Sequence, residues 1–525
     1  MSAVSYSIQG GDYEHGGAAS RALKEQLKKV GADPAVVRRA MVAAYEAEMN
    51  VVIHAHRGEL RASLDNGQLE VEVIDEGPGI PDIAQAMKAG FSTASARARE
   101  YGFGAGMGLP NIKKNSDRFA IESEVGRGTR VSFTIHLRPQ ALYGAGQHSL
   151  HIDAARCRQA LRCLHTCPTL AMRVRRNKPE VLDYLCIDCG ACITTCPSGA
   201  LQVAGAAGTL APVGDGVLVV TAESLAQFGA GVGPDRVLAV LAKLGFHDVR
   251  VSSAWESALR AAMLEYARTT APVSPTIAPA CPAVVNLIEM RFPALIPHVA
   301  PFRSALEALQ VEIGGRRALY VTSCPAQRTA LLSAGTQPAP EVLLPAALHA
   351  AVAPHVVTGR DAPLPIPQPS AACEPGLLWV TGIRHVLNVL EAVENGQAGD
   401  VQAIEPWACD AGCFGSPLLR EDAFLSRHRW TAPRGLDGAA RAIPRARPLA
   451  ARPGLRLDTD MAKAIQKLAK IDKLKRSLPG SDCAMCGAPT CAALAEDIVL
   501  GRASADACVR QAPPAGPAAN QEIAP

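Results

Sequence analysis

The residues with the most evident chemistry in this sequence are its cysteines. The chain has 525 residues and 16 cysteines, and all of these except Cys373 fall into four groups with regular spacing. Thiolates bind iron and zinc, and such spacing in a long chain indicates metal sites rather than the disulfide framework of a small secreted domain. Metal sites of this kind predict a reducing, cytoplasmic location.

One group is a complete C-x₂-C-x₂-C-x₃-C-P run. Its members are Cys186, Cys189, Cys192 and Cys196, followed by Pro197. This spacing wraps the backbone around an iron–sulfur cubane, and in the two-cluster pattern the last cysteine ligates the other cluster. A structural zinc site is the alternative, but the trailing Cys-Pro and a paired first half argue against it. Residues 145–205 resemble bacterial two-cluster ferredoxins, and the resemblance implies a full 4Fe–4S site made by Cys167, Cys186, Cys189 and Cys192.

The other ferredoxin-like site departs from the family pattern. The resemblance assigns to it Cys157, Cys163 and Cys196, but Ala160 stands where a fourth cysteine is expected. Three thiolates could hold a 3Fe–4S cluster or a 4Fe–4S cluster with a different fourth ligand, or the site could be empty. Ligand identity tunes cluster potential, so a cluster at this site should differ from its neighbour.

A third group is spread over residues 206–450, where short apolar stretches alternate with helical ones and indicate an α/β domain. Cys281 and Cys324 are each followed by proline, and Cys409 and Cys413 form a C-x₃-C pair. The set resembles the C-terminal domain of iron-only hydrogenases and their non-hydrogenase relatives. The resemblance implies that these four cysteines bind a cubane, with Cys413 as the would-be bridge to a diiron centre.

Departures from the hydrogenase pattern predict that the hydrogen chemistry is lost. Ala280 replaces a proton-shuttling cysteine and has no ionisable group. Gln327 replaces a lysine, so an anionic diiron centre would lose a charge-assisted partner. The glycine run after the last ligand is reduced to 414–417. We therefore expect a cubane without the diiron centre, and no hydrogen turnover.

The last group lies near the C-terminus. Its ligands would be Cys483, Cys486, Cys491 and Cys508. Residues 455–511 resemble the small four-cysteine 4Fe–4S domain of the Rnf electron-transport complex and of corrinoid iron–sulfur proteins, with zinc as the alternative. The basic stretch 461–477 before it is expected to be a solvated helix rather than a membrane anchor, because its apolar face is short. Residues 512–525, rich in Pro and Ala, are expected to be disordered.

A second kind of chemistry lies in the N-terminal quarter. Asp33-Pro34 predicts a helix start, and on the following helix Glu46 and Asn50 are four residues apart and share a face. A predicted strand over 69–73 leads to a D-x-G-x-G turn, and a glycine cluster follows at 102–108. Each of these features alone is typical of a solvated helix surface or of a turn. In this order they resemble the GHKL ATPase superfamily over residues 1–138, especially the anti-sigma factor and switch-protein serine kinases.

This resemblance implies a role for each residue. Glu46 would be the general base for the attacking hydroxyl or water, Asn50 would hold Mg²⁺, and Asp75 would accept a hydrogen bond from the adenine amino group. The turn glycines Gly77 and Gly79 would let the backbone approach the base. The cluster glycines Gly104, Gly106 and Gly108 would form a lid whose N–H groups meet the phosphates. Glycine-rich donors, a helix N-terminus and oxygen ligands suit phosphate and Mg²⁺.

These groups need several domains to position them. The length predicts three or four domains, and the expected fold class is multidomain α/β and α+β: a GHKL ATPase sandwich, a ferredoxin-like dicluster insert, a hydrogenase-like α/β domain and a small iron–sulfur domain. The stretch between Pro338 and Pro375 is expected to be a long loop. Basic residues number 53 and acidic ones 49, too small an excess for a nucleic-acid footprint. No apolar run near 18 residues and no charged-then-apolar leader is apparent, so we expect neither a membrane span nor export.

Two functions remain open for a chain that combines ATP, Mg²⁺ and several clusters. The first is a redox-responsive signalling protein, whose clusters sense reduction and whose serine/threonine-kinase-like ATPase phosphorylates or sequesters a regulatory protein. The second is an ATP-gated electron-transfer oxidoreductase that delivers low-potential electrons to an acceptor at the hydrogenase-like cubane. The kinase-like motifs and the lost hydrogenase groups favour the first, and the number of clusters favours the second. A redox partner protein or a phosphoacceptor protein is expected in each case.

Overall fold

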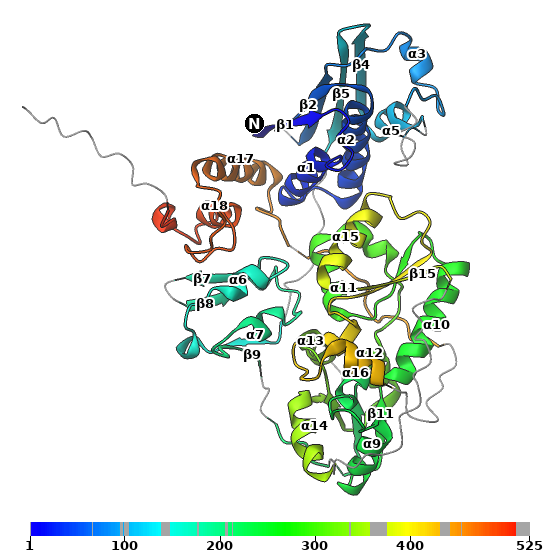
Figure 1. The fold of residues 1–525 in the computed structure, drawn as a ribbon, viewed down its shortest axis with the longest axis vertical. Coiled ribbons are helices and arrows are strands. Elements are labelled where there is room, and N and C mark those ends of the chain that lie inside the picture. The colour runs from blue at the N-terminus through cyan, green and yellow to red at the C-terminus, as the bar shows by residue number, and fades with distance from the viewer. Residues whose placement is uncertain are drawn as a thin grey trace, which may run out of the picture. The chain divides into compact units, whose positions relative to one another are not determined.

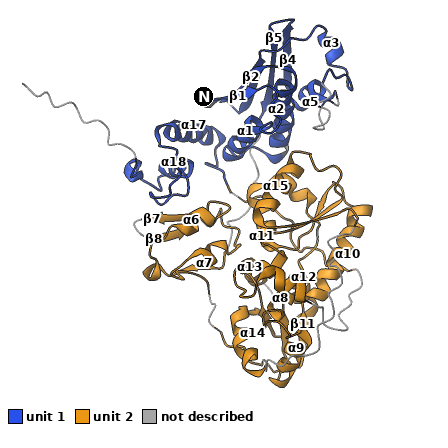
Figure 2. Ribbon diagram, viewed as in Figure 1, with its two compact units in different colours: residues 1–141, 455–525 blue, residues 142–454 orange. Residues whose placement is uncertain are grey.

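The computed structural model describes most of the chain. The described residues are 2–65, 67–94, 98, 104, 106–137, 148–175, 178–204, 208–212, 214–334, 338–356, 375–430, 441–452 and 454–510. They belong to two compact units, one made of residues 1–141 and 455–525 and the other of residues 142–454 (Figures 1 and 2). Gly102, Cys373 and the tail 512–525 lie outside the described residues. Among those described, no helix combines the length and apolar character that crossing a bilayer requires.

The first unit is built on an antiparallel sheet with the strand order β1-β2-β3-β5-β4. The strands are β1 (Ser2–Gln9), β2 (Arg57–Asp65), β3 (Gln68–Asp75), β4 (Arg118–Glu124) and β5 (Gly128–His136). Side chains alternate along the strands, so one face carries buried residues such as Leu60, Val71 and Phe133. The other face carries charges, including the ion pair between Arg130 and Glu72. The strand predicted over 69–73 is present as part of β3.

Helices cover the apolar face of this sheet. They are α1 (Ala18–Lys29), α2 (Pro34–His54) and α5 (Gly108–Asn115), whereas the short α3 (Ile83–Ala86) has no buried residue. Pro34 begins α2, as the Asp-Pro signal predicts. The buried carboxylate of Glu48 on α2 accepts hydrogen bonds from three backbone N–H groups at the start of α1, those of Gly17, Ala19 and Ser20, at 2.9–3.0 Å. The orphan donors of α1 are therefore satisfied by α2, and the two helices are fixed to each other.

The C-terminal cysteine module belongs to the same unit (Figure 2). Its helices are α17 (Met461–Ser477) and α18 (Cys491–Val499). The expectation that 461–477 forms a solvated helix is wrong. Ile465, Leu468 and Ile471 are buried in the same hydrophobic core as Leu23 and Leu27 of α1. The apolar face of α17 is short, but it spans three turns and finds a complementary face on the ATPase-like part of the unit.

The second unit contains two small antiparallel hairpin-like sheets and two parallel sheets. The antiparallel pairs are β6 (Leu150–Ile152) with β9 (Leu201–Val203), and β7 (Met172–Arg175) with β8 (Lys178–Val181). They frame the short helices α6 (Arg162–Thr166) and α7 (Ala191–Thr195). Each of these helices ends immediately before a cysteine, Cys167 or Cys196.

The parallel sheets form the α/β part. One has the order β11-β10-β13-β14 and the other β12-β16-β15. The strands are β10 (Val217–Val220), β11 (Val249–Val251), β12 (Thr276–Ile277), β13 (Ala318–Val321), β14 (Glu341–Leu343), β15 (Leu377–Thr381) and β16 (Ala403–Trp407). The helices are α8 (Ala222–Leu225), α9 (Pro234–Lys243), α10 (Ser253–Thr269), α11 (Pro282–Arg291), α12 (Ala305–Ile313), α13 (Pro325–Ser333), α14 (Pro345–Val352), α15 (Ile383–Glu394) and α16 (Ala423–Arg429). Every residue of β10 is buried, as expected for a strand in a covered parallel sheet.

The long loop expected between Pro338 and Pro375 is wrong for its first half. Residues 341–343 form β14, which pairs in parallel with β13, and Pro345 begins α14 at a position where proline is favoured. This stretch is rich in Pro and Ala, and proline usually indicates a loop. At the first position of a helix, however, proline is favoured, and the prediction did not allow for this at Pro345. The remainder, 357–374, lies outside the described residues.

Candidate iron–sulfur and nucleotide sites

The four cysteines of the central domain lie together at the carboxyl ends of strands. Cys281 and Cys324 follow β12 and β13, and each occupies the cap position before a helix whose first residue is proline. Cys409 and Cys413 lie on the loop after β16, where the Nη1 of Arg427 donates to the carbonyl oxygen of Ala411 at 3.0 Å. Crevices outside the carboxyl ends of strands are where α/β folds place their ligands.

These four thiols surround a hollow with about 360 Å³ of empty space. Cys189 of the ferredoxin-like segment lines the same hollow. Burial raises the pKa of the Cys324 and Cys413 thiols well above the usual range, with neighbouring charges as lesser causes. A buried hollow lined by thiols suits an iron–sulfur cluster, whose irons take thiolate ligands. Ligand binding must then displace the thiol protons.

The C-terminal module encloses a second thiol-lined hollow, with about 290 Å³ of empty space. It is lined by Cys483, Cys486, Cys491 and Cys508. Cys491 is the first residue of α18, and its backbone N–H donates to Oδ1 of Asp482 at 2.7 Å. Positive φ angles at Asp482, Ala484 and Gly487 (44°, 58° and 78°) wind the loop around the hollow. All four residues that the sequence assigns to this site line one cavity.

The ferredoxin-like segment gathers its cysteines in the two predicted sets. Cys167, Cys186, Cys189 and Cys192 interact electrostatically with one another, and burial raises the pKa of Cys189 to about 12. Backbone N–H groups donate to the sulfurs of Cys167, Cys186 and Cys196 at 3.2–3.4 Å. Such hydrogen bonds tune cluster potential.

The second set is smaller. Cys163 interacts with both Cys157 and Cys196. At the position of the expected fourth cysteine, Ala160 offers only a methyl group, between two residues in the left-handed region, Gln159 and Leu161. Throughout the described ranges, no three His, Cys, Asp or Glu side chains converge closely enough to hold a single metal ion.

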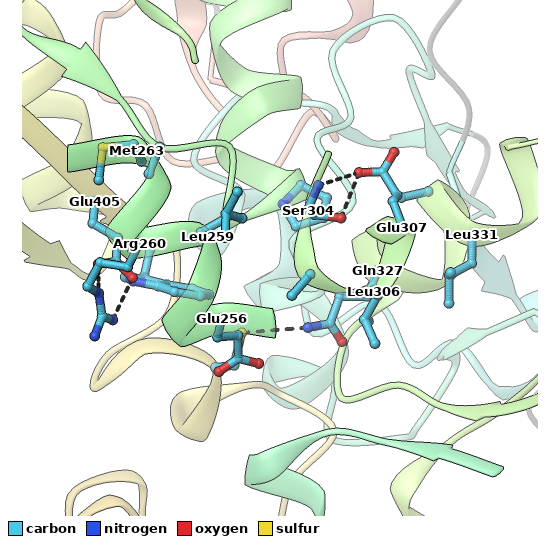
Figure 3. A pocket seen from close by; sticks show the side chains of 17 residues that line it. Glu256, Leu259, Arg260, Met263, Ser304, Leu306, Glu307, Gln327, Leu331 and Glu405 are labelled. Atoms are coloured by element: carbon cyan, nitrogen blue, oxygen red, sulfur yellow. Dashed lines mark hydrogen bonds and ion pairs between the residues drawn. The ribbon is translucent and has the colours of Figure 1, made fainter. Parts of the chain in front are cut away.

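The neighbourhood of Cys413 does not fit an anionic diiron centre. Gln327 has its amide oriented by Ser323, whose N–H and Oγ are each 3.0 Å from Oε1, so its Nε2 faces Cys413 Sγ at 3.6 Å. A neutral amide therefore stands where charge neutralisation is needed. Beside it lies a pocket lined by three glutamates and the single cation Arg260 (Figure 3). An excess of carboxyl groups repels an anion.

The nucleotide-site residues come together at the start of α5. A Cβ atom added at Gly108 would lie 3.0 Å from Oδ1 of Asn50 and 3.4 Å from Oε2 of Glu46. The structure therefore brings these three residues together. A helix N-terminus that meets a carboxylate and an amide oxygen across a small gap can hold phosphate through N–H groups and Mg²⁺ through oxygens. Gly104 and Gly106 both have positive φ, 92° and 71°, as a glycine lid requires.

The turn after β3 holds the residues that the sequence analysis assigns to the nucleotide base. Asp75 accepts from the backbone N–H of Thr129 at 3.2 Å, and burial raises the pKa of its carboxyl. A Cβ atom at Gly77 would lie 2.7 Å from Oδ1 of Asp75. Gly79 has φ of 71°, and a Cβ atom there would lie 2.2 Å from the carbonyl oxygen of Glu124, so only glycine fits.

Sequence reasoning missed two residues of this site. Asn111 Nδ2 donates to Oε1 of Glu46 at 2.7 Å, and Glu48 anchors α1 between the positions of Glu46 and Asn50. The only signal for Asn111 is its place in the first turn after Gly108. Glu48 gives no signal, because a glutamate on a helix usually faces solvent.

Family models match four parts of the chain. The model for histidine kinase-, DNA gyrase B- and HSP90-like ATPases matches residues 35–139, and a 4Fe-4S dicluster domain matches 149–197. The C-terminal domain of the iron only hydrogenase large subunit matches 216–310, and an Fe-S cluster model matches 478–510. The serine/threonine-protein kinase RsbT of Bacillus subtilis is 32% identical over 125 residues, which are 23% of this chain and 88% of that protein.

Through its N-terminal domain, the chain belongs to the histidine kinase-, DNA gyrase B- and HSP90-like ATPase family. Another relative of this ATPase domain is an anti-sigma F factor of Caldanaerobacter subterraneus, 35% identical over 97 residues. That match covers 18% of this chain and 64% of the relative, so it spans less than two thirds of the relative's length. The predicted resemblances, and the multidomain fold class with an ATPase domain and a hydrogenase-like domain, are thereby confirmed.

Solved FeFe-hydrogenase structures show a weaker likeness. A variant of HydA1 from Chlamydomonas reinhardtii is 15% identical, with a TM-score of 0.30, and the match covers 48% of this chain and 88% of that chain. A hydrogenase studied for oxygen inactivation at its H cluster is 14% identical, with a TM-score of 0.31, covering 43% of this chain and 86% of that chain. Together, the family matches and the cysteine sets make this an ATP-binding iron–sulfur protein.

Proposed function

We propose that this protein is a redox-responsive ATPase of the serine/threonine-kinase type, in which the C-terminal cluster controls the nucleotide site. The observation that carries the proposal is the single hydrophobic core shared by α17, α18 and the ATPase helices. Two modules that fold around one core cannot move independently, because protein interiors are close-packed and respond to small changes in volume.

A continuous set of contacts leads from the cluster site to the nucleotide site. Helix α18 starts at Cys491 and carries Glu496, whose Oε2 pairs with Nζ of Lys29 at 3.3 Å. Lys29 is the last residue of α1, and its carbonyl oxygen accepts from the N–H of Leu457 at 2.9 Å. The other end of α1 is held by Glu48, which lies on α2 between Glu46 and Asn50.

Reduction adds one negative charge to a cluster at this module. That charge alters the balance of forces on α18 and hence on the end of α1 that it contacts. If α1 shifts, the Glu48 hydrogen bonds transmit the shift to the helix that carries the base. A redox state that favours one arrangement of α2 then favours or disfavours bound nucleotide, and linkage makes the effect reciprocal.

The test compares nucleotide affinity in two redox states. ATP with Mg²⁺ is titrated anaerobically into the full chain with Glu46→Ala, which prevents turnover, poised either oxidised or reduced. We expect affinities that differ by about fivefold or more. A tenfold difference should appear as a shift of about 59 mV in the cluster potential on ATP binding. Glu496→Gln should reduce the difference while the cluster remains bound. Equal affinities in the two states would disprove the proposal.

Kinase activity is the catalytic part of the proposal. In this proposal, Glu46 accepts the proton of a serine or threonine hydroxyl, or of water, and the nearby glycines bind the phosphates. Glu46→Ala should abolish turnover and spare nucleotide binding, whereas unchanged turnover would remove its role as base. The acceptor protein is expected to be a regulatory partner, by analogy with the named kinase relative.

One observation favours electron transfer as a second candidate function. Cys189, assigned to a ferredoxin-like cluster, lines the hollow formed by the four central thiols. Clusters at the two sites would be close neighbours, as in an electron-transfer chain. ATP-dependent reduction of an added acceptor protein would support this function. Hydrogen evolution from reduced methyl viologen is not expected under either candidate, and sustained evolution would contradict the loss of the diiron centre.

A further inference from the structure

The pocket beside the central thiols is not needed for either candidate function. It has about 630 Å³ of empty space and is bounded by α10, α12, α13 and β16. Cys413, Gln327 and Trp407 line both this pocket and the thiol-lined hollow. Figure 3 shows Met263, Arg260 and Glu405 on one side and Glu307, Gln327 and Leu331 on the other.

Trp407 presents an unsatisfied donor in this region. Trp407 is only 9% exposed, and its buried Nε1–H has no hydrogen-bond partner in the described parts of the chain. Buried indole N–H groups are normally paired, and an unpaired one costs stability. The indole N–H is therefore available to an acceptor that the described residues do not supply, in a region where Trp407 lines both the pocket and the thiol-lined hollow.

The charges around the pocket exclude an anionic occupant. Arg260 donates to both carboxylate oxygens of Glu405, at 2.6 and 2.8 Å, so these two charges cancel. Glu307 accepts from the N–H and Oγ of Ser304 at the start of α12. Glu256 accepts from Oγ of Ser252 at 2.6 Å. No cation among the described lining residues is left for an anion, and burying an unpaired charge is costly.

We propose that this pocket binds a small, uncharged organic molecule whose carbonyl-type oxygen accepts a hydrogen bond from Nε1 of Trp407. The unpaired N–H requires an acceptor, which a simple organic cation lacks, and the carboxyl groups disfavour an anion. The apolar body of the ligand lies against aliphatic side chains of the three helices. These are Leu259, Met263, Leu306 and Leu331.

With such a site, the protein would respond to a small molecule as well as to the redox state of its clusters. A molecule bound here touches Gln327 and Cys413, and so reaches the surroundings of the central cluster. The site depends on neither the kinase proposal nor the coupling of α18 to α1, because all of its lining residues belong to the second unit. Its failure or success is therefore independent of the proposed function.

Benzamide is a suitable probe because it joins an apolar ring to a neutral carbonyl. Benzoate provides the anionic control of nearly the same shape, and benzamidine the cationic one. Binding to the anaerobically isolated full chain is followed by saturation-transfer NMR. We expect saturable binding of benzamide, at least tenfold weaker binding of benzoate because of the carboxyl groups, and about fivefold weaker binding of benzamidine because it offers no acceptor to Nε1 of Trp407. Benzoate binding as tightly as benzamide would overturn the charge argument, and benzamidine doing so would overturn the acceptor argument.

Variants locate the binding and test the indole. Trp407→Phe should weaken benzamide binding about fivefold, as expected for one lost neutral hydrogen bond. Trp430→Phe, outside the pocket lining, should change it less than twofold. Ala330→Phe should fill the pocket and abolish saturable binding without loss of iron. If Trp407→Phe leaves benzamide affinity unchanged and instead shifts a cluster potential, the indole N–H serves the cluster and the proposal is wrong.

Discussion

Nδ2 of Asn111 donates a hydrogen bond to Oε1 of Glu46, 2.7 Å away. The bond joins the first turn of α5, at the edge of the glycine lid, to the proposed catalytic base on α2. It fixes one carboxylate oxygen and leaves the other, Oε2, facing the gap beside Gly108. A base is effective only when its free oxygen is held toward the reacting hydroxyl, so Asn111 is a positioning residue for this site.

Asn111→Ala should lower kcat for ATP turnover about tenfold with little change in KM, because it removes orientation and not nucleotide contacts. Asn111→Asp should also move the acidic limb of the pH–rate profile to higher pH, since a second carboxylate disfavours ionisation of the base. Asn115→Ala, one turn later on the same helix, is the control and should retain near-normal kcat. Steady-state kinetics across pH distinguish these results. A change confined to KM would contradict the positioning role.

Leu468→Ala should destabilise the first unit by about 2–4 kcal/mol, because it opens a cavity in the core shared by α17 and α1. Leu468 is fully buried, whereas Leu425, in the second unit, is 51% exposed; Leu425→Ala is the control for a leucine truncation outside the shared core, with an expected loss below about 0.5 kcal/mol. Urea unfolding under argon gives the free energies, and ATP affinity should fall with stability. A normal ATP affinity and a normal unfolding free energy in Leu468→Ala would show that the shared core does not support the ATPase domain.

Glu256 should make stability pH-dependent near neutrality. Burial, with Glu223 as a lesser cause, raises the pKa of Glu256 from 4.5 to about 7. The folded state then keeps a proton that the unfolded state has lost, so stability falls as pH rises from about 4.5 to about 7 and is constant above. Glu256→Gln should remove this penalty and be more stable than wild type at pH 8, by on the order of 1–3 kcal/mol.

The gain from Glu256→Gln should shrink as the pH is lowered toward 5. Glu265→Gln, at an exposed position on the same helix, is the control and should show no such trend. Urea unfolding midpoints of wild type and both variants, measured between pH 5.5 and 8.5, test this pH dependence. A gain that is equal at all these pH values would indicate a packing effect and not a protonation effect.

Ala160→Cys should complete the fourth thiolate of the smaller ferredoxin-like set. If the natural site holds a 3Fe–4S cluster, the variant should gain about one iron per chain and lose the paramagnetic signal of the three-iron form. Iron and sulfide analysis with EPR measures both. Ser198→Cys, beside Cys196, supplies a control thiol at a different position and should leave the iron content unchanged. Identical iron content and spectra in Ala160→Cys would mean that position 160 does not contact a cluster.

The sequence predicted those parts of the sites whose geometry is local. The four-residue spacing of Glu46 and Asn50 fixes them on one helix face, and the Cys-Pro pairs place Cys281 and Cys324 at helix starts after strands. Regular cysteine spacing likewise predicted which thiols line the hollow of the C-terminal module. In each case, chain geometry over a few residues determines the arrangement.

Features that depend on contacts between distant segments were not predictable. The apolar residues of α17 show a helical period, but nothing in the sequence identifies α1 as the surface that covers them. The bond between Asn111 and Glu46 joins positions 65 residues apart. The unsatisfied N–H of Trp407 depends on how β16 packs, because the same tryptophan would be satisfied by one nearby carbonyl.

The core shared by α1 and α17 also affects the order of folding during synthesis. Residues 1–141 leave the ribosome first, but the side chains that cover α1 arrive only after the whole of residues 142–454 has been made. At ordinary translation rates this interval is roughly 15–60 s. During it the nascent ATPase domain lacks the apolar side chains that α17 adds to its core, so chaperone binding to this domain should fall once α17 emerges.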